Sequence, residues 1–325
     1  MLKQGCFQIS VTYCSIAMLL LFASCTTNIE LDLPEAEPKL VVEGSINAGG
    51  PPIVTLSRNA SFFGEVNLKD FDQYFVNGAN VWVYSNSDSV KLGEFCTASF
   101  PENVQRQLAK SLGYSFSDTV QLPNICIYTI PEIIDLFQGD SSNAFLGEYR
   151  KSYSLKVEAE GKTLTSKTSI PAKPDVHSLG VIPHPDEKKD SLVSVSITFS
   201  VPDSGGNFIR YLTKRNSEPF YAPLSASVYS DKLFRGGTYT FPLEAGQNPN
   251  REIDWETYSY FWKGDTVKVK WSTIDKAHYD FWNTIENDGG DSPLSTPTRI
   301  KSNINGGLGI WGGYGAVYLS IIVPE

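Results

Sequence analysis

Short runs in which apolar and polar residues alternate, separated by turn-forming residues, recur from Leu40 to the end of the chain. SLVSVSITFSVPD is the clearest example, because every second residue from Val193 to Phe199 is apolar and the residues between them are serine or threonine. Successive side chains of a strand point to opposite faces, so such a run predicts a strand with one buried and one wet face. The pattern therefore predicts an all-β fold.

The spacing of these runs predicts two β-sandwich domains. Three hairpin patterns fall within residues 40–172, each with turn-forming residues between its two strands, and they indicate an immunoglobulin-like sandwich. Residues 173–190 are rich in proline and charged residues and are predicted to be a linker. A second immunoglobulin-like sandwich is expected over residues 191–325.

Two stretches depart from the strand pattern. Residues 96–143 are irregular and contain two short helical patterns that each end at a glycine, so we interpret them as a small mixed insertion in the first sandwich. In STIDKAHYDFWNTIENDGG, apolar residues recur at helical spacing, which predicts a helix over residues 274–287 with Ser272 or Thr273 as its N-cap. The apolar side of this helix is expected to cover an open end or face of the second sandwich.

The first residues have the features of an export signal. A positive charge is followed by an apolar run, residues 16–22, which is shorter than the about 20 residues that a spanning helix needs. LLFASC resembles the bacterial lipobox, with phenylalanine where leucine is usual, so residues 1–24 are predicted to be a lipoprotein signal peptide. The thiol of Cys25 would be acylated, and the polar, acidic residues 25–39 would form a tether. An ordinary signal peptide followed by a chance cysteine is the alternative.

The sequence favours the outer membrane as the destination. Thr26 follows the cysteine, in place of the aspartate that retains many lipoproteins at the inner membrane. No later segment has about 18 consecutive apolar residues, so the lipid is expected to hold the protein at the membrane. The cell surface is favoured over the periplasmic face.

Charge and cysteine content narrow the function further. The formal net charge is −9 and the basic residues do not cluster, which argues against nucleic acid and against electrostatic docking on anionic lipid. After removal of the signal, Cys96 and Cys126 remain beside Cys25, and two thiols in an exported protein predict a disulfide. Two buried free cysteines are the alternative.

No pattern of residues predicts catalysis, a metal or a cofactor. The chain has three histidines, none of them in a zinc-binding pattern, and it has no G-x-S-x-G motif for a serine nucleophile. His278 is expected to be a half-buried helix residue. Acidic pairs such as Asp254 with Glu256 keep a hydrolase as a further hypothesis.

Aromatic residues gather in DWETYSYFWKGD. Trp255, Tyr258 and Trp262 could offer a stacking platform for sugar rings or peptide, or anchor an interface, because large rings supply contact energy at low entropic cost. The alternative is a strand whose aromatic residues are divided between core and surface. Neither interpretation can be wholly false. Phe261 and Trp262 are adjacent, so in a strand one would point to the core and the other to the surface.

Glycine is concentrated near the end of the chain, in TRIKSNINGGLGIWGGYGA. An apolar strand follows instead of a helix, so a phosphate-binding loop is excluded. A flexible linker is excluded as well, because Trp311 and Tyr314 would be left in water. We interpret the segment as a closing hairpin of the second domain, with turns or bulges at residues 306–307 and 312–313. Trp311 and Tyr314 are added to the candidate contact residues.

Three segments also carry a resemblance: TPTRIKSNINGGLGIWGGYGA, the HYDFW helix before it, and KLVVEGSI after the lipobox cysteine. They resemble a domain-of-unknown-function family of Bacteroidota lipoproteins that are commonly encoded beside TonB-dependent receptors. The resemblance implies an all-β outer-membrane lipoprotein that acts with a receptor barrel in nutrient uptake. It supplies no catalytic residues.

The hypothesis that follows is a non-catalytic accessory or binding lipoprotein that partners a TonB-dependent transporter. A direct glycan- or peptide-binding lipoprotein that uses the surface aromatic residues is the alternative, and a hydrolase is the third hypothesis. The identity of the small-molecule ligand is left open.

Overall fold

Strands dominate the part of the chain that the structure describes. The computed structural model describes residues 38–59, 74–86, 88–99, 101–103, 105–106, 124–232, 236–249, 251–287 and 299–325. Residues 1–37, which contain the predicted signal peptide and most of the predicted tether, lie outside them, and Pro38–Glu325 forms one compact unit. The strand-rich composition confirms the predicted all-β class.

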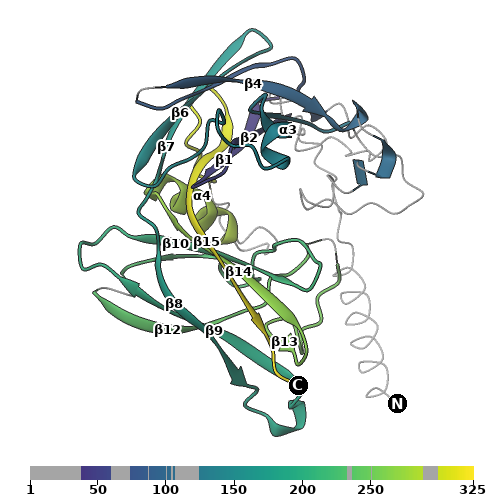
Figure 1. The fold of residues 1–325 in the computed structure, drawn as a ribbon, viewed down its shortest axis with the longest axis vertical. Helices are drawn as coiled ribbons and strands as arrows, with labels where there is room; N and C mark the ends of the chain where they lie inside the picture. Colours follow the sequence, from purple (N-terminus) through teal and green to yellow (C-terminus); the bar gives the residue numbers. More distant parts are fainter. Residues whose placement is uncertain are drawn as a thin grey trace, which may run out of the picture. The chain divides into compact units, whose positions relative to one another are not determined.

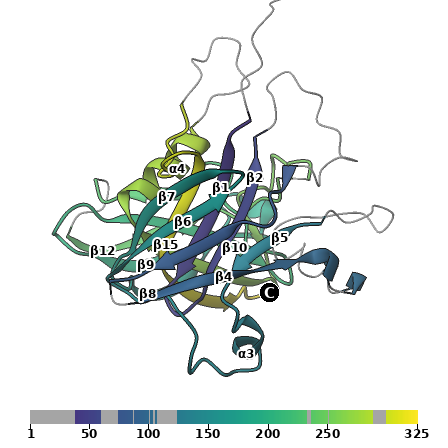
Figure 2. The same ribbon diagram turned by 90° about the horizontal axis from the view of Figure 1, so that it is seen from above.

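The first half of this unit is built from antiparallel neighbours. Its strands are β1 (Leu40–Asn47), β2 (Pro52–Arg58), β3 (Asn80–Tyr84), β4 (Ser89–Cys96), β5 (Cys126–Thr129), β6 (Lys151–Ala159) and β7 (Lys162–Ile170). They lie side by side in the order β1-β2-β5-β4-β3-β6-β7, and much of this order can be followed in Figure 2. Their inward residues, with Trp311 from the far end of the chain, form one apolar cluster.

The second half is a sandwich of two sheets. Its strands are β8 (Asp175–Pro183), β9 (Leu192–Val201), β10 (Phe208–Arg215), β11 (Val228–Ser230), β12 (Gly237–Leu243), β13 (Phe261–Trp262), β14 (Thr266–Ile274) and β15 (Leu308–Ile322). Strands β8, β9, β12 and β13 form one sheet, and β11-β10-β14-β15 belongs to the sheet of the first half. Residues of both sheets form a second apolar cluster, and Figure 1 shows the two sheets lying against each other.

Strand β15 links the two halves and changes the predicted domain picture. It pairs in parallel with β1 and antiparallel with β14, so the described residues contain one continuous sheet of eleven strands. Trp311 enters the first apolar cluster, whereas Val317 and Leu319 pack on the second. The prediction of a closing hairpin is therefore wrong, because the end of the chain is a long strand between two distant partners.

The segment predicted as a linker, residues 173–190, also differs. It contains strand β8, which pairs with β9, and the short 3₁₀ helix η3 (Glu187–Lys189). Pro171 and Pro174 precede the strand and Pro183 is its last residue, which are positions that leave the ladder intact. These three prolines therefore bound a strand, and Pro185 lies in the short connection that follows it.

The predicted insertion, residues 96–143, is partly integrated into the sheet. Strand β5 lies between β2 and β4. The second helical pattern forms α3 (Ile133–Phe137), and Thr97–Ser99 forms the 3₁₀ helix η2. Most of the first helical pattern lies outside the described residues.

The predicted late helix is α4 (Lys276–Glu286), and it begins one residue after a different cap from the one expected. Ser272 and Thr273 belong to β14, and the Asp275 carboxylate instead accepts a hydrogen bond from the backbone N of His278 at 2.9 Å. Its second oxygen accepts from the Thr168 hydroxyl at 2.7 Å, which fastens the helix to β7. The helix packs on β10, β11 and β15, and Figure 1 shows it beside β10 and β15. None of the helices in the described ranges has the length and hydropathy to cross a bilayer.

The glycines at residues 312–313 serve close packing within β15. A Cβ atom on Gly312 would lie 2.6 Å from Cε1 of His278, and one on Gly313 would lie 2.6 Å from the carbonyl oxygen of Ser169. Helix α4 and the end of β7 therefore approach β15 more closely than any larger residue permits. Gly306 does occupy a turn, with φ of +84°, as the sequence predicted for that position.

Candidate functional site

The predicted aromatic segment, residues 254–265, follows β12, contains β13 and presents two tryptophans to solvent. Trp255 is 70% exposed and packs edge-on against Tyr258, with 5.7 Å between ring centroids. Trp262 is 41% exposed, whereas Phe261 beside it is buried in the second apolar cluster. The alternation predicted for this pair is therefore present, and Trp255 and Trp262 are available for contact.

Hydrogen bonds hold the aromatic segment in place. The Asp254 carboxylate accepts from the backbone N of Glu256 at 3.0 Å and from the Thr257 hydroxyl at 2.9 Å, and these bonds lower the pKa of Asp254. The carboxylate of Glu256 lies 3.5 Å from Nζ of Lys189. Asp254 thus stabilises a turn, and Glu256 faces a lysine.

A pocket of about 230 Å³ borders the same segment. Ser259 and Tyr260 form one wall, and residues of β12, including Phe241, form another. The backbone N of Ala245 donates to the carbonyl of Ser259 at 3.2 Å, which joins the end of β12 to the aromatic segment. The pocket wall is therefore continuous in the chain with the exposed aromatic residues.

Trp311 and Tyr314 are not surface contact residues, so this part of the predicted site is wrong. Trp311 is 0% exposed, and its indole N–H donates to the carbonyl of Tyr153 at 3.1 Å. Tyr314 is buried beneath α4. Both rings are buried because α4 and β7 cover the two faces of β15.

A polar cluster that the sequence did not predict lies where Tyr314 meets β10 and β14. The Arg210 guanidinium stands 3.5 Å above the Trp282 ring and donates to the Tyr314 hydroxyl at 2.7 Å. Lys270 donates to Oδ1 of Asn47 at 3.0 Å and lies 4.4 Å from the centroid of the Tyr314 ring. Burial, with Arg210 as a smaller cause, lowers the pKa of Lys270 to about 8.

His278 completes this cluster from the helix side. It is 1% exposed instead of half-buried, and its ring packs edge-on against Tyr314 with centroids 4.4 Å apart. Burial lowers the pKa of His278 well below its ordinary value, and the positive charges of Arg210 and Lys270 act in the same direction. His278 is therefore neutral in the folded protein.

The neutral His278 makes a testable contribution to stability. Its folded pKa lies below the unfolded value of about 6.5, so protonation favours the unfolded chain as pH falls below about 6.5. We expect a loss of up to about 1.4 kcal/mol per pH unit in the free energy of unfolding from this group. Urea unfolding at about pH 7.5 and about pH 5 measures it.

A matched pair of variants separates this effect from the rest of the acid response. His278→Gln removes the titration and should flatten the slope, whereas His177→Gln, which changes an exposed histidine, should keep it. The ionisable groups that face His278 are Asp275 at the helix start, Arg210 on β10, Lys270 on β14 and Tyr314 on β15. Equal slopes in wild type and His278→Gln would contradict the assignment.

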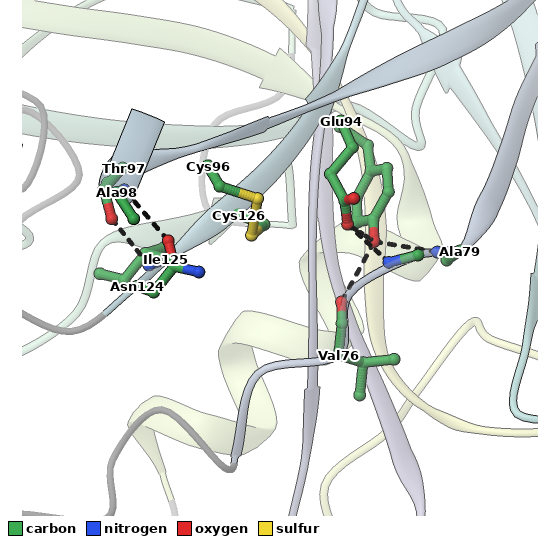
Figure 3. Close-up of a disulfide and its surroundings, with 11 residues drawn as sticks. Val76, Ala79, Glu94, Cys96, Thr97, Ala98, Asn124, Ile125 and Cys126 are labelled. Carbon is green, nitrogen blue, oxygen red and sulfur yellow. Dashed lines mark hydrogen bonds between the residues drawn. A yellow bond between two sulfur atoms is a disulfide. The ribbon is translucent and has the colours of Figure 1, made fainter. Parts of the chain in front are cut away.

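The predicted cysteine pair is joined by a disulfide. Cys96 ends β4 and Cys126 begins β5, and the two residues are direct partners in the register of these strands. Beyond the bridge, the backbone N of Thr97 donates to the carbonyl of Ile125 at 2.9 Å, as Figure 3 shows. The Glu94 carboxylate lies near both sulfurs, but bonded sulfurs offer no thiolate to a metal.

The predicted lipid attachment residue, Cys25, lies outside the described residues. The model of a family described as Domain of unknown function (DUF4249) matches residues 26–318 of the chain. No curated protein is similar enough to this chain to count as a match.

Proposed function

We propose that this chain, which belongs to the DUF4249 family, is a lipid-anchored outer-membrane protein that works by binding, without catalysis, beside a TonB-dependent transporter. One observation carries the proposal. LLFASC ends at Cys25, and the family match begins at residue 26, so the matched region begins directly after the residue that would carry the lipid.

The spacing between anchor and body suits this arrangement. Residues 25–39 separate the cysteine from the start of β1 at Leu40 and span at most about 50 Å when extended. Their polar, acidic and proline-containing composition is typical of a tether. A body held within that reach of a bilayer would meet a membrane-embedded partner far more often than a freely diffusing protein would.

The partner and the setting rest on the resemblance of three segments to Bacteroidota lipoproteins encoded beside TonB-dependent receptors. The proposal includes nutrient uptake as the process and the cell surface as the favoured side of the outer membrane. It also includes an immunoglobulin-like sandwich in each half, which is supported by the separate apolar cluster that each half contains.

A second candidate function is direct binding of a glycan or peptide. The observation that favours it is the exposure of Trp255 and Trp262, together with the edge-on packing of Trp255 on Tyr258. Exposed rings held on a hydrogen-bonded segment provide contact area with little loss of side-chain entropy on binding.

Acylation of Cys25 is the first prediction of the proposal. In the native host, the wild type should fractionate with membranes and carry fatty acyl groups on its N-terminal cysteine by mass spectrometry. Cys25→Ser should abolish the acylation, because the thiol is the acceptor. Cys14→Ser, within the predicted signal peptide, is the matched control and should behave as wild type. An unmodified sulfur at residue 25 in a soluble wild-type product would overturn the proposal.

The partner is tested separately. Wild-type protein purified from detergent-solubilised membranes should bring a TonB-dependent receptor with it, identified by mass spectrometry. Acylated protein that is recovered alone, under conditions that preserve barrel complexes, would remove the transporter from the proposal and keep the lipid anchor.

A further inference from the structure

The pocket beside the aromatic segment contains an acidic side chain without a basic partner. One carboxylate oxygen of Glu244 accepts a hydrogen bond from the Ser225 hydroxyl at 2.8 Å. Within the described ranges of the chain, no lysine, arginine or histidine nitrogen lies within 4.0 Å of that carboxylate. A hydroxyl donor leaves the negative charge of Glu244 in place, so the pocket holds an uncompensated carboxylate.

Aromatic rings line the same pocket as this carboxylate. Tyr211, Tyr229, Phe241 and Tyr260 line the pocket together with Glu244. The centroids of Tyr229 and Phe241 are 5.1 Å apart in an edge-on arrangement, and those of Tyr211 and Tyr229 are 6.1 Å apart in a stacked one. Ring faces carry partial negative charge. The aromatic rings and the carboxylate of this pocket would therefore both attract a cation.

The electrostatics of the tyrosines agree with this arrangement. Burial raises the pKa of Tyr229, and the charge of Glu244 raises it further. Burial also raises the pKa of Tyr211, with Tyr229 as the next cause, whereas the hydrogen bond that the Tyr211 hydroxyl accepts from the backbone N of Glu244 lowers it. Both phenols therefore stay protonated and neutral at physiological pH.

The size and charge of the pocket restrict its ligand. A volume of about 230 Å³ holds roughly seven or eight waters, which is room for one small head group and not for an oligosaccharide. An anion would meet the Glu244 charge in a chain whose net charge is already −9. A neutral ligand would leave the carboxylate without a counter-charge as it is desolvated, which is costly.

We propose that this pocket binds the positively charged group of a small ligand, an alkylammonium or a guanidinium. Glu244 supplies the counter-charge, and the rings of Phe241 and Tyr260 enclose the alkyl part. Tyr260 follows Trp255 and Tyr258 in the same segment, so the exposed rings would contact the remainder of a longer ligand. The inference rests on the second function above, direct ligand binding, and is independent of the lipid anchor and of the transporter.

Calorimetric titration of the purified full chain in detergent tests the proposal, with n-butylammonium and n-butylguanidinium as probes and n-butanol as the uncharged probe. The cations should bind at least about tenfold more tightly than butanol, because they alone gain the counter-charge and the ring faces. Glu244→Gln should weaken cation binding by about tenfold or more and leave butanol unchanged. Equal affinity of cation and butanol would overturn the proposal.

Matched variants control for nonspecific effects. Glu252→Gln removes an exposed acid that lies two residues before the aromatic segment, and it should leave the affinity unchanged. Tyr260→Leu keeps the apolar volume but removes the ring, and a loss of about fivefold is expected from the missing cation–ring attraction. Equal losses in Glu244→Gln and Glu252→Gln would show attraction by general charge and would also overturn the proposal.

A sugar probe distinguishes failure of the pocket from failure of direct ligand binding. Suppose that methyl glucoside binds, that Trp255→Ala weakens it and that Glu244→Gln does not. Direct binding through the exposed rings would then stand, and the ammonium site would be wrong. If neither the cations nor the sugar bind to the wild type, both are wrong.

Discussion

Trp311→Ala is expected to lower the free energy of unfolding by about 3–5 kcal/mol, as large-to-small substitutions of buried aromatic residues do. The Trp311 ring has no exposed surface and belongs to the apolar cluster of the first half, although it lies near the end of the chain. It packs so tightly on β1 that a Cβ atom on Gly44 would lie 2.8 Å from the ring. Urea or thermal unfolding of the full chain measures the loss.

Trp255→Ala is the matched control for this experiment. Trp255 is 70% exposed, so its truncation should change the free energy of unfolding by about 0.5 kcal/mol or less. The sequence placed both tryptophans in one set of candidate contact residues, and this pair of variants separates the buried one from the exposed one. A loss in Trp311→Ala as small as that in Trp255→Ala would contradict the position of Trp311 in the core.

Much of the strand content could be predicted because alternation is a local property. The run from Val193 to Phe199 records which face is buried, and it lies within β9, whose inward residues form the core of the second sandwich. The hairpin of β6 and β7 and the helix α4 were predicted for the same reason. In each, spacing within about ten residues shows which side meets the core.

The path of β15 could not be predicted in this way. Its partner β1 lies at the other end of the described chain, and an apolar strand carries no mark that identifies a distant neighbour. A turn or bulge was predicted at Gly312 and Gly313 because paired glycines are common there. The sequence does not show that other parts of the chain pack closely against them. The His278 ring and the Ser169 carbonyl, which require glycine there, come from elements that are brought close only by the complete fold.

The candidate site was predicted in part, for a related physical reason. The adjacent residues Phe261 and Trp262 were correctly divided between core and surface, since alternation decides this locally. Arg210 and Lys270 occupy strand positions that look solvent-facing in the sequence, and α4 and Tyr314 cover them only in the folded chain. Glu244 likewise gains its aromatic neighbours from four separate segments.

Removal of the disulfide is expected to have the second large effect. Cys96 and Cys126 are 30 residues apart, and opening a loop of that length raises the entropy of the unfolded chain. The chain-entropy estimate is a loss of about 3–4 kcal/mol in the free energy of unfolding. The double variant Cys96→Ala/Cys126→Ala should show this loss in urea unfolding under oxidising conditions.

Reduction of the wild type is the control for the double variant, because it opens the disulfide without changing any other side chain. The backbone hydrogen bond from Thr97 to Ile125 and that from the Tyr128 hydroxyl to Glu94, at 2.5 Å, can form without it. Dithiothreitol should therefore lower the stability of the wild type to that of the double variant and leave the double variant unchanged. If the oxidised and reduced wild type unfold at the same urea concentration, the bridge does not constrain the unfolded chain. The other strands around β5 would then have to hold this part of the sheet alone.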